Sequence, residues 1–245
     1  MKYLYGNWKM YLDNTESIEL AKNVFAMDFD PKKIEVAIFP SLLSLSEILQ
    51  INKSAVKIGC QNFDYHEKGA YTGEVSIFSL KKIDCQTVLV GHSERRYVFG
   101  EDGKVVKNKF VACLENGIKP VLCIGEKKEE KENNLTFQVL ANQLQEILSE
   151  IDLKEKQFIL AYEPVWAIGS GNPCLPQEAQ KIISFLKEEI KKYTELEIPI
   201  LYGGSVNYEN VIDFLQYSEI DGVLVGSDSS KKENFQKMLD KVSKL

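Results

Sequence analysis

Eight short apolar runs recur about every 31 residues along the 245-residue chain, and they restrict its fold more than any other feature. The runs span 3–8, 34–39, 56–60, 87–90, 120–124, 158–163, 199–202 and 222–225. Most are continuously apolar rather than alternating, as expected of strands that are covered on both faces. Amphipathic stretches separate them, most clearly at 105–114, 134–151, 177–193 and 207–215. We therefore predict alternating strands and helices, with parallel strands joined by right-handed crossovers.

No linker rich in proline, glycine or serine divides the chain, so we predict one domain over residues 1–245. Eight strand-helix units in one domain form either a closed (β/α)8 barrel or an open doubly wound sheet. An open sheet that binds nucleotides usually has a GxGxxG sequence after its first strand. Here the first run ends in Gly6-Asn7-Trp8-Lys9 instead, which favours the closed α/β barrel.

The charge balance disfavours large anionic partners. Thirty Lys and Arg face 36 Asp and Glu, giving a formal net charge of −6, so binding to nucleic acid through bulk charge is not expected. A small anion remains possible, because a local site can oppose the global sign. The mixed-sign run at 127–132 is interpreted as a solvated segment without a chemical role.

The chain contains neither a signal-peptide pattern at its start nor an apolar run approaching the ~20 residues of a membrane span. We therefore expect a cytoplasmic protein with no membrane association. Its five cysteines include no CxxC pair, and with only two histidines there is no zinc-binding spacing. We interpret these cysteines as buried thiols in a reducing compartment.

Polar residues at the ends of three predicted strands suggest proton-transfer chemistry. Asn7 and Lys9 follow the first run, His92 follows the fourth, and Glu163 ends the sixth. In a (β/α)8 barrel these strand ends meet at one mouth. A carboxylate base, an imidazole electrophile and a fixed positive charge can together abstract a proton beside a carbonyl.

Small residues in the last three strand-helix loops indicate a phosphate site. They are Gly169-Ser170-Gly171, Gly203-Gly204-Ser205 and Gly226. Backbone N–H groups in such loops can approach a ligand closely, and barrels often hold phosphate after strands seven and eight. The apolar segment 164–171 directly follows Glu163, and we interpret it as a lid that excludes water.

The motifs of the chain, taken together and in order, resemble those of the triosephosphate isomerase family from nearly end to end. The matching segments are 6–9, 61–62, 69–74, 91–96, 123–126, 162–169 and 202–207. The resemblance implies a glycolytic and gluconeogenic isomerase that interconverts glyceraldehyde 3-phosphate and dihydroxyacetone phosphate through an enediolate, without a metal or organic cofactor.

By this resemblance Glu163 is the base, and His92 is an electrophile that acts as a neutral imidazole. Lys9 stabilises the enediolate and helps to hold the substrate, and Asn7 orients the substrate oxygens. Thr72 would reach the active site of a partner subunit, so a homodimer is implied. The resemblance also implies a set of backbone amides that bind the phosphate: Gly169, Ser205, Gly226 and Ser227.

Two segments depart from the family pattern. The eighth loop reads Gly226-Ser227-Asp228-Ser229-Ser230, where the family commonly has Gly-Gly-Ala-Ser-Leu. A carboxylate at Asp228 would repel a phosphate dianion, unless Asp228 or Ser229 caps the helix that follows and faces away from the ligand. We favour capping. After the lid, Asn172-Pro173 replaces a common Lys-Thr, which is expected to alter lid opening rates but not chemistry.

Two other functions compete with the isomerase. A barrel that has lost catalysis would fit the altered eighth loop but leaves Lys9, His92 and Glu163 together unexplained. A different phosphate-binding barrel enzyme, such as another sugar-phosphate isomerase or lyase, leaves the segments around His92 and from Glu163 to Gly171 without an explanation.

Overall fold

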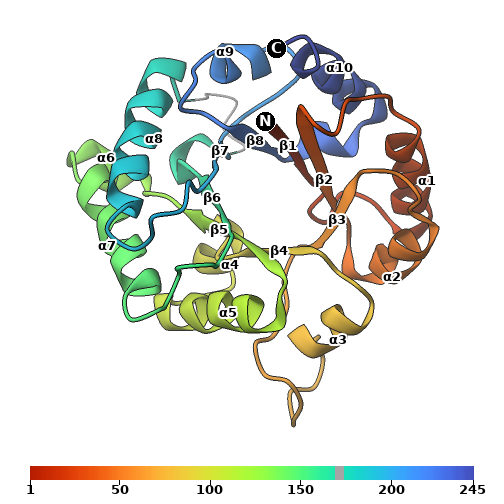
Figure 1. Ribbon diagram of the computed structural model, residues 1–245, viewed down its shortest axis with the longest axis horizontal. Coiled ribbons are helices and arrows are strands. Elements are labelled where there is room, and N and C mark those ends of the chain that lie inside the picture. The colour runs from red at the N-terminus through yellow and green to blue at the C-terminus, as the bar shows by residue number, and fades with distance from the viewer. Residues whose placement is uncertain (169–173) are drawn as a thin grey trace.

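The computed structural model describes residues 1–168 and 174–245, and in them parallel strands β1 to β8 close into a barrel in chain order (Figure 1). The strands are β1 (Lys2–Asn7), β2 (Ile34–Phe39), β3 (Lys57–Cys60), β4 (Thr87–Val90), β5 (Lys119–Ile124), β6 (Ile159–Tyr162), β7 (Ile200–Tyr202) and β8 (Gly222–Val225). The predicted (β/α)8 barrel is confirmed. Each predicted strand end lies within one residue of the observed end.

Helices surround the barrel and connect consecutive strands. They are α1 (Asn14–Phe25), α2 (Leu42–Ile51), α3 (Ile77–Lys82), α4 (Ser93–Tyr97), α5 (Gly103–Asn116), α6 (Lys128–Glu132), α7 (Thr136–Leu148), α8 (Pro176–Ile190), α9 (Val211–Leu215) and α10 (Lys232–Val242), with 3-10 turns η1 (Val165–Ala167) and η2 (Ser227–Ser230).

Local chemistry explains where individual helices begin and end. The α5 helix begins after Asp102, whose carboxylate accepts a hydrogen bond from the Val105 amide, and ends at Gly117 with φ 71°. The predicted helix at 207–215 is shorter than expected. Asn207 accepts the amides of Glu209 and Asn210 in a side-chain-stabilised turn, so α9 begins only at Val211.

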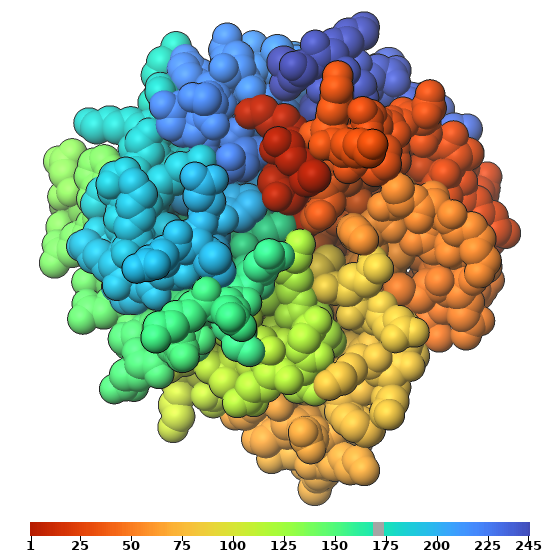
Figure 2. Space-filling model, in the orientation of Figure 1, coloured from red at the N-terminus to blue at the C-terminus, as the bar shows by residue number. Residues whose placement is uncertain are grey.

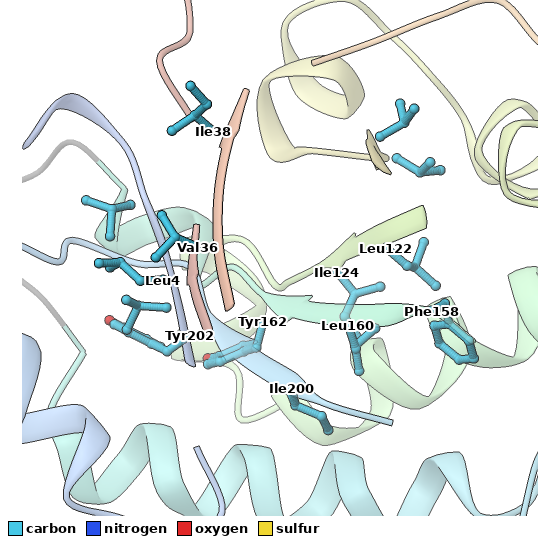
Figure 3. Close-up of a cluster of buried hydrophobic side chains, with 14 of the residues drawn as sticks. Leu4, Val36, Ile38, Leu122, Ile124, Phe158, Leu160, Tyr162, Ile200 and Tyr202 are labelled. Atoms are coloured by element: carbon cyan, nitrogen blue, oxygen red, sulfur yellow. The ribbon is translucent and has the colours of Figure 1, made fainter. Parts of the chain in front are cut away.

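Strand side chains alternate between two buried clusters, which explains why the runs are apolar on both faces. One cluster fills the barrel interior, and its members are Tyr5, Ala37, Phe39, Leu89, Val121, Cys123, Ile159, Ala161, Leu201 and Leu224. The other lies between the strands and the helices, and Figure 3 shows part of it, with side chains from β1, β2, β5, β6 and β7. All five cysteines are buried free thiols, as predicted.

The strands and helices bring the loops that follow β1 to β8 to one end of the barrel. The loop between β3 and α3 stands out from the barrel (Figure 1) and forms the orange projection at the lower edge of the molecule in Figure 2. No helix in the described residues is both long and apolar enough to cross a membrane.

Candidate active site

A cavity of about 330 Å³ lies where the strands end, and it brings together the predicted site residues from distant parts of the chain. Among the residues lining it are Asn7, Lys9, His92, Glu163, Ser205, Gly226, Ser227 and Asp228. Gly169, the fourth predicted phosphate ligand, lies outside the described residues. The predicted lid, 164–171, is described only as far as Ile168, and Asn172 and Pro173 are also outside the described residues.

Glu163 lies directly after β6 and is almost fully buried, with 2% exposure. Its backbone N–H donates to the Ile124 carbonyl at 2.8 Å, which joins it to the end of β5. Its Oε1 lies 3.1 Å from Nε2 of His92, and its Oε2 accepts the Ser93 amide at 2.8 Å. The predicted base and the predicted electrophile are therefore direct neighbours.

His92 directly precedes α4, and its ring is oriented by the first turn of that helix. Nδ1 accepts the backbone N–H of Glu94 at 3.2 Å. Because Nδ1 is an acceptor, a neutral ring carries its proton on Nε2, the nitrogen that faces Glu163. A neutral imidazole in this orientation can donate a hydrogen bond to a substrate oxygen.

Lys9 stands on a tight backbone turn with φ 49°, a left-handed conformation that is uncommon for a lysine. Its N–H donates to Oδ1 of Asn7 at 3.0 Å, and Nε2 of Gln61 donates to its carbonyl oxygen at 2.8 Å. Its ammonium pairs with Oε1 of Glu94 at 2.7 Å. Asn7 and Gln61 therefore hold the turn that directs Lys9 into the cavity.

The predicted phosphate end is formed by loops after β7 and β8. A Cβ added to Gly226 would lie 3.5 Å from Cε of Lys9, so this glycine faces the lysine across the cavity. Ser227, which follows it, lies outside the left-handed region, which among the described non-glycine residues includes only Lys9, Asp84, Asn134 and Glu150. Serine therefore fits at this position without backbone strain.

Capping by Asp228 or Ser229, which we favoured from the sequence, is wrong. The Asp228 carboxylate accepts the side-chain amide of Asn234 at 3.0 Å and lies 3.8 Å from the ammonium of Lys231. Ser229 donates its hydroxyl to the Val225 and Gly226 carbonyls. Lys231 precedes α10 without any side-chain cap, and Asp228 lines the cavity instead of facing away from it.

The described part of the predicted lid is held by Glu126. Oε1 of this buried carboxylate accepts the Trp166 indole N–H at 2.8 Å and contacts the Tyr162 hydroxyl at 3.1 Å. Burial raises the pKa of Glu126 despite these hydrogen bonds. The run at 127–132 is more structured than predicted: it forms α6, and Lys131 lies over the Trp166 ring and pairs with Glu178.

Sequence reasoning gave no role to several residues that position the site. Gln61, Glu94 and Glu126 each follow a strand end, and Ser93 contributes only its backbone amide. For Gln61, Glu94 and Glu126, the position after a strand end was a sequence signal of a place in the site, because all strand ends of a closed barrel meet at this mouth. An amide donor gives no sequence signal of its own.

Thr72 does not line this cavity. It is exposed on the projecting loop between β3 and α3. Within the described residues, no three His, Cys, Asp or Glu side chains are grouped to hold a metal ion.

Comparison with known proteins agrees with this geometry. The sequence model described as triosephosphate isomerase matches residues 2–242. The triosephosphate isomerase of Aquifex aeolicus (strain VF5) is 41% identical over 240 residues, covering 96% of each chain. That of Dehalococcoides mccartyi (strain CBDB1) is 44% identical over 235 residues, or 94% of this chain and 92% of the relative. That of Francisella tularensis subsp. tularensis is 35% identical over 248 residues, with 100% and 98% coverage. The chain therefore belongs to the triosephosphate isomerase family of enzymes.

Proposed function

We propose that this chain interconverts glyceraldehyde 3-phosphate and dihydroxyacetone phosphate, with Glu163 as the base, His92 as the electrophile and Lys9 as the electrostatic stabiliser. The observation that carries this assignment is the 3.1 Å contact between Glu163 and His92 in a cavity that Lys9 also lines. The full-length match to one enzyme family supports the same substrates.

Glu163 removes a proton from the hydroxyl-bearing carbon beside the substrate carbonyl and returns it to the former carbonyl carbon, while the hydroxyl proton passes from one substrate oxygen to the other. In the described state its carboxylate is held by the Ser93 amide and by His92. The Ser93 hydrogen bond and the His92 contact must both be exchanged for contacts with the substrate, so the carboxylate rotates away from Ser93 when it takes the proton. Burial of this group keeps competing water away from the reaction.

His92 and Lys9 stabilise the negative charge that develops on the substrate oxygen. The Nε2 proton of His92 donates a hydrogen bond to that oxygen, and the Lys9 ammonium provides a fixed positive charge in the same cavity. Asn7 fixes the Lys9 turn through its Oδ1 and presents its amide N–H₂ to the substrate. No metal or organic cofactor takes part in this proposal, because the carbonyl already acidifies the neighbouring C–H.

The phosphate is held by backbone amides of Gly169, Ser205, Gly226 and Ser227, with Lys9 nearby. The cavity wall formed by Ser205, Gly226 and Ser227 supports this assignment. Amide donors explain how a chain of net charge −6 takes an anionic substrate. Segment 164–171 closes over the bound substrate, beginning at the turn that Glu126 anchors through Trp166.

The test is a coupled assay in both reaction directions on the wild type and on Glu163→Asp. Shortening the base by one methylene moves the carboxylate by about 1 Å, and such a displacement is expected to lower kcat by about 100-fold. Glu132→Asp, on exposed α6, makes the same chemical change away from the cavity and serves as the control. Exchange of solvent deuterium into the substrate carbon should fall in parallel. Equal activity in the wild type and Glu163→Asp would exclude Glu163 as the base.

We further propose that the active form is a homodimer in which the Thr72 loop of one copy contacts the site of the other. An apolar cavity of about 570 Å³ adjoins the active site and is lined by Met10, Val98 and Phe99 together with Lys9 and His92. Met10, Val98 and Phe99 are 94%, 72% and 64% exposed, and a group of exposed apolar side chains beside a cavity is a feature of protein–protein contact sites.

Sedimentation velocity tests the dimer. Phe99→Asp is expected to give monomers with strongly reduced activity, whereas Leu135→Asp, at an exposed apolar residue before α7, should leave the dimer intact. A wild type that sediments as a fully active monomer would refute the dimer without affecting the assignment of Glu163.

A further inference from the structure

The phosphate end of the cavity contains a negative charge that the proposed reaction does not use. Asp228 lines the cavity together with Ser227, and its side chain is only 15% exposed. The side-chain amide of Asn234, in the first turn of α10, holds the carboxylate at 3.0 Å. Asp228 is therefore fixed near the place where the ligand anion binds.

Lys231 compensates this charge only partly. Its ammonium lies 3.8 Å from the Asp228 carboxylate, beyond hydrogen-bond distance, and its side chain is 61% exposed. Asp228 lines the cavity, whereas Lys231 is not among the described lining residues. The Asp228 carboxylate therefore lies nearer to the cavity than the Lys231 ammonium does.

The other charges of the cavity do not cancel Asp228. Of the described lining residues, Lys9 carries a positive charge, and Glu163 and Asp228 carry negative charges. Lys9 is itself paired with Glu94 at 2.7 Å. An arriving dianion meets backbone amides that attract it and a carboxylate that repels it.

We propose that Asp228 is a specificity-determining residue that weakens the binding of dianions relative to monoanions, with Lys231 offsetting part of the repulsion. This inference rests on the proposed function, because it takes Ser205, Gly226 and Ser227 as the anion site. A charge–charge repulsion scales with the charge of the ligand, whereas a steric or packing effect does not. Ligands of similar shape and different charge therefore separate the two explanations.

The experiment is a chemical-shift titration of the backbone amides at low ionic strength, with sulfate as the dianion and methanesulfonate as the monoanion. Asp228→Asn keeps an acceptor for the Asn234 amide and removes the charge. It should tighten sulfate binding by about four- to tenfold and methanesulfonate binding by about two- to threefold. Lys231→Met should weaken sulfate binding by about two- to threefold. Both effects should shrink in 0.3 M sodium chloride, because salt screens charges of this kind.

Matched controls come from the opposite end of the barrel. Asp152→Asn and Lys154→Met make the same charge changes in the exposed segment before β6, and neither should alter anion binding. Equal changes for both anions in Asp228→Asn, no change, or weaker sulfate binding would each overturn the proposal. If sulfate left the Ser205 and Gly226 amides unshifted in the wild type, the proposed phosphate site would fail instead. Isomerase activity, assayed separately, tests the proposed reaction.

Discussion

Gly125 lies where β5 ends and contacts the backbone of the proposed base. A Cβ added at this position would lie 1.7 Å from the Glu163 carbonyl oxygen and 2.6 Å from its carbonyl carbon. Gln143 fixes the glycine from the other side, accepting its N–H at 3.0 Å and donating to its carbonyl at 2.9 Å. We predict that Gly125→Ala disrupts both the fold at this point and catalysis.

The expected magnitude follows from the overlap. Real Cβ atoms essentially never approach another heavy atom closer than 3.0 Å, so the Gly125 and Glu163 backbones must separate by about 1.3 Å. The contact is with backbone atoms on an adjacent strand end, which cannot rotate away as a side chain does. Overpacking of this kind costs about 1–3 kcal/mol of stability. A displacement of about 1 Å at the base lowers kcat by about 100-fold.

Urea denaturation and the coupled isomerase assay measure the two effects. Gly103→Ala is the matched control, because its added Cβ would lie 1.9 Å from the carboxylate of Glu146, the flexible end of a side chain that can move. Gly103 begins α5, where alanine is also the better helix former, so this variant should keep both stability and activity. Wild-type stability and kcat in Gly125→Ala would refute the reasoning.

Three further predictions concern buried ionisable groups. Burial raises the pKa of Cys60 to about 11 and of Cys85 to about 12, so at pH 8 a thiol reagent should react with them at least ~100-fold more slowly in the folded protein than in urea. Because burial raises the pKa of Glu126, ionisation of this carboxyl opposes folding. The contribution of Glu126 to the free energy of unfolding is therefore present at low pH and is lost as the pH rises above about 4.5. In urea titrations Glu126→Gln should therefore gain stability relative to the wild type between pH 4.5 and 7. Lys109 is 4% exposed and donates to Glu101 at 2.6 Å, and Lys109→Met should cost about 3 kcal/mol by leaving that carboxylate short of a partner.

Each of these predictions has a clear contrary result. Equal labelling rates with and without urea would show that the thiols are accessible in the folded state. A stability difference between Glu126→Gln and the wild type that stays constant with pH would show that Glu126 titrates normally. Full stability in Lys109→Met would show that Arg95, which donates to the same Glu101 oxygen at 2.7 Å, satisfies the carboxylate alone.

The sequence was sufficient to predict the barrel because strands that are buried on both faces are continuously apolar, and such runs are recognisable in the sequence. It was also sufficient to bring Lys9, His92 and Glu163 together, since strand ends of a closed barrel meet at one mouth. The hydrogen bond from the Ser93 backbone amide to the Glu163 carboxylate was not predictable, because every residue except proline carries such an amide. The partner of a side chain was not predictable either: the sequence allowed Asp228 to cap the following helix, but its carboxylate is bound by Asn234, six residues later. Such a choice depends on how η2 and α10 pack, which no local pattern encodes.

The first turn of α4 explains how three groups from β1, β4 and β6 keep fixed positions relative to one another. The Ser93 amide holds the Glu163 carboxylate, the Glu94 amide holds the His92 ring, and the Glu94 side chain holds the Lys9 ammonium. The proposed base, electrophile and cation are therefore all positioned by two consecutive residues, Ser93 and Glu94, and not only by the rigidity of the barrel. This turn follows Gly91, whose φ of 70° only glycine adopts readily. A change in the backbone at Gly91 should consequently displace all three groups together, lowering kcat more than the loss of any single hydrogen bond among them.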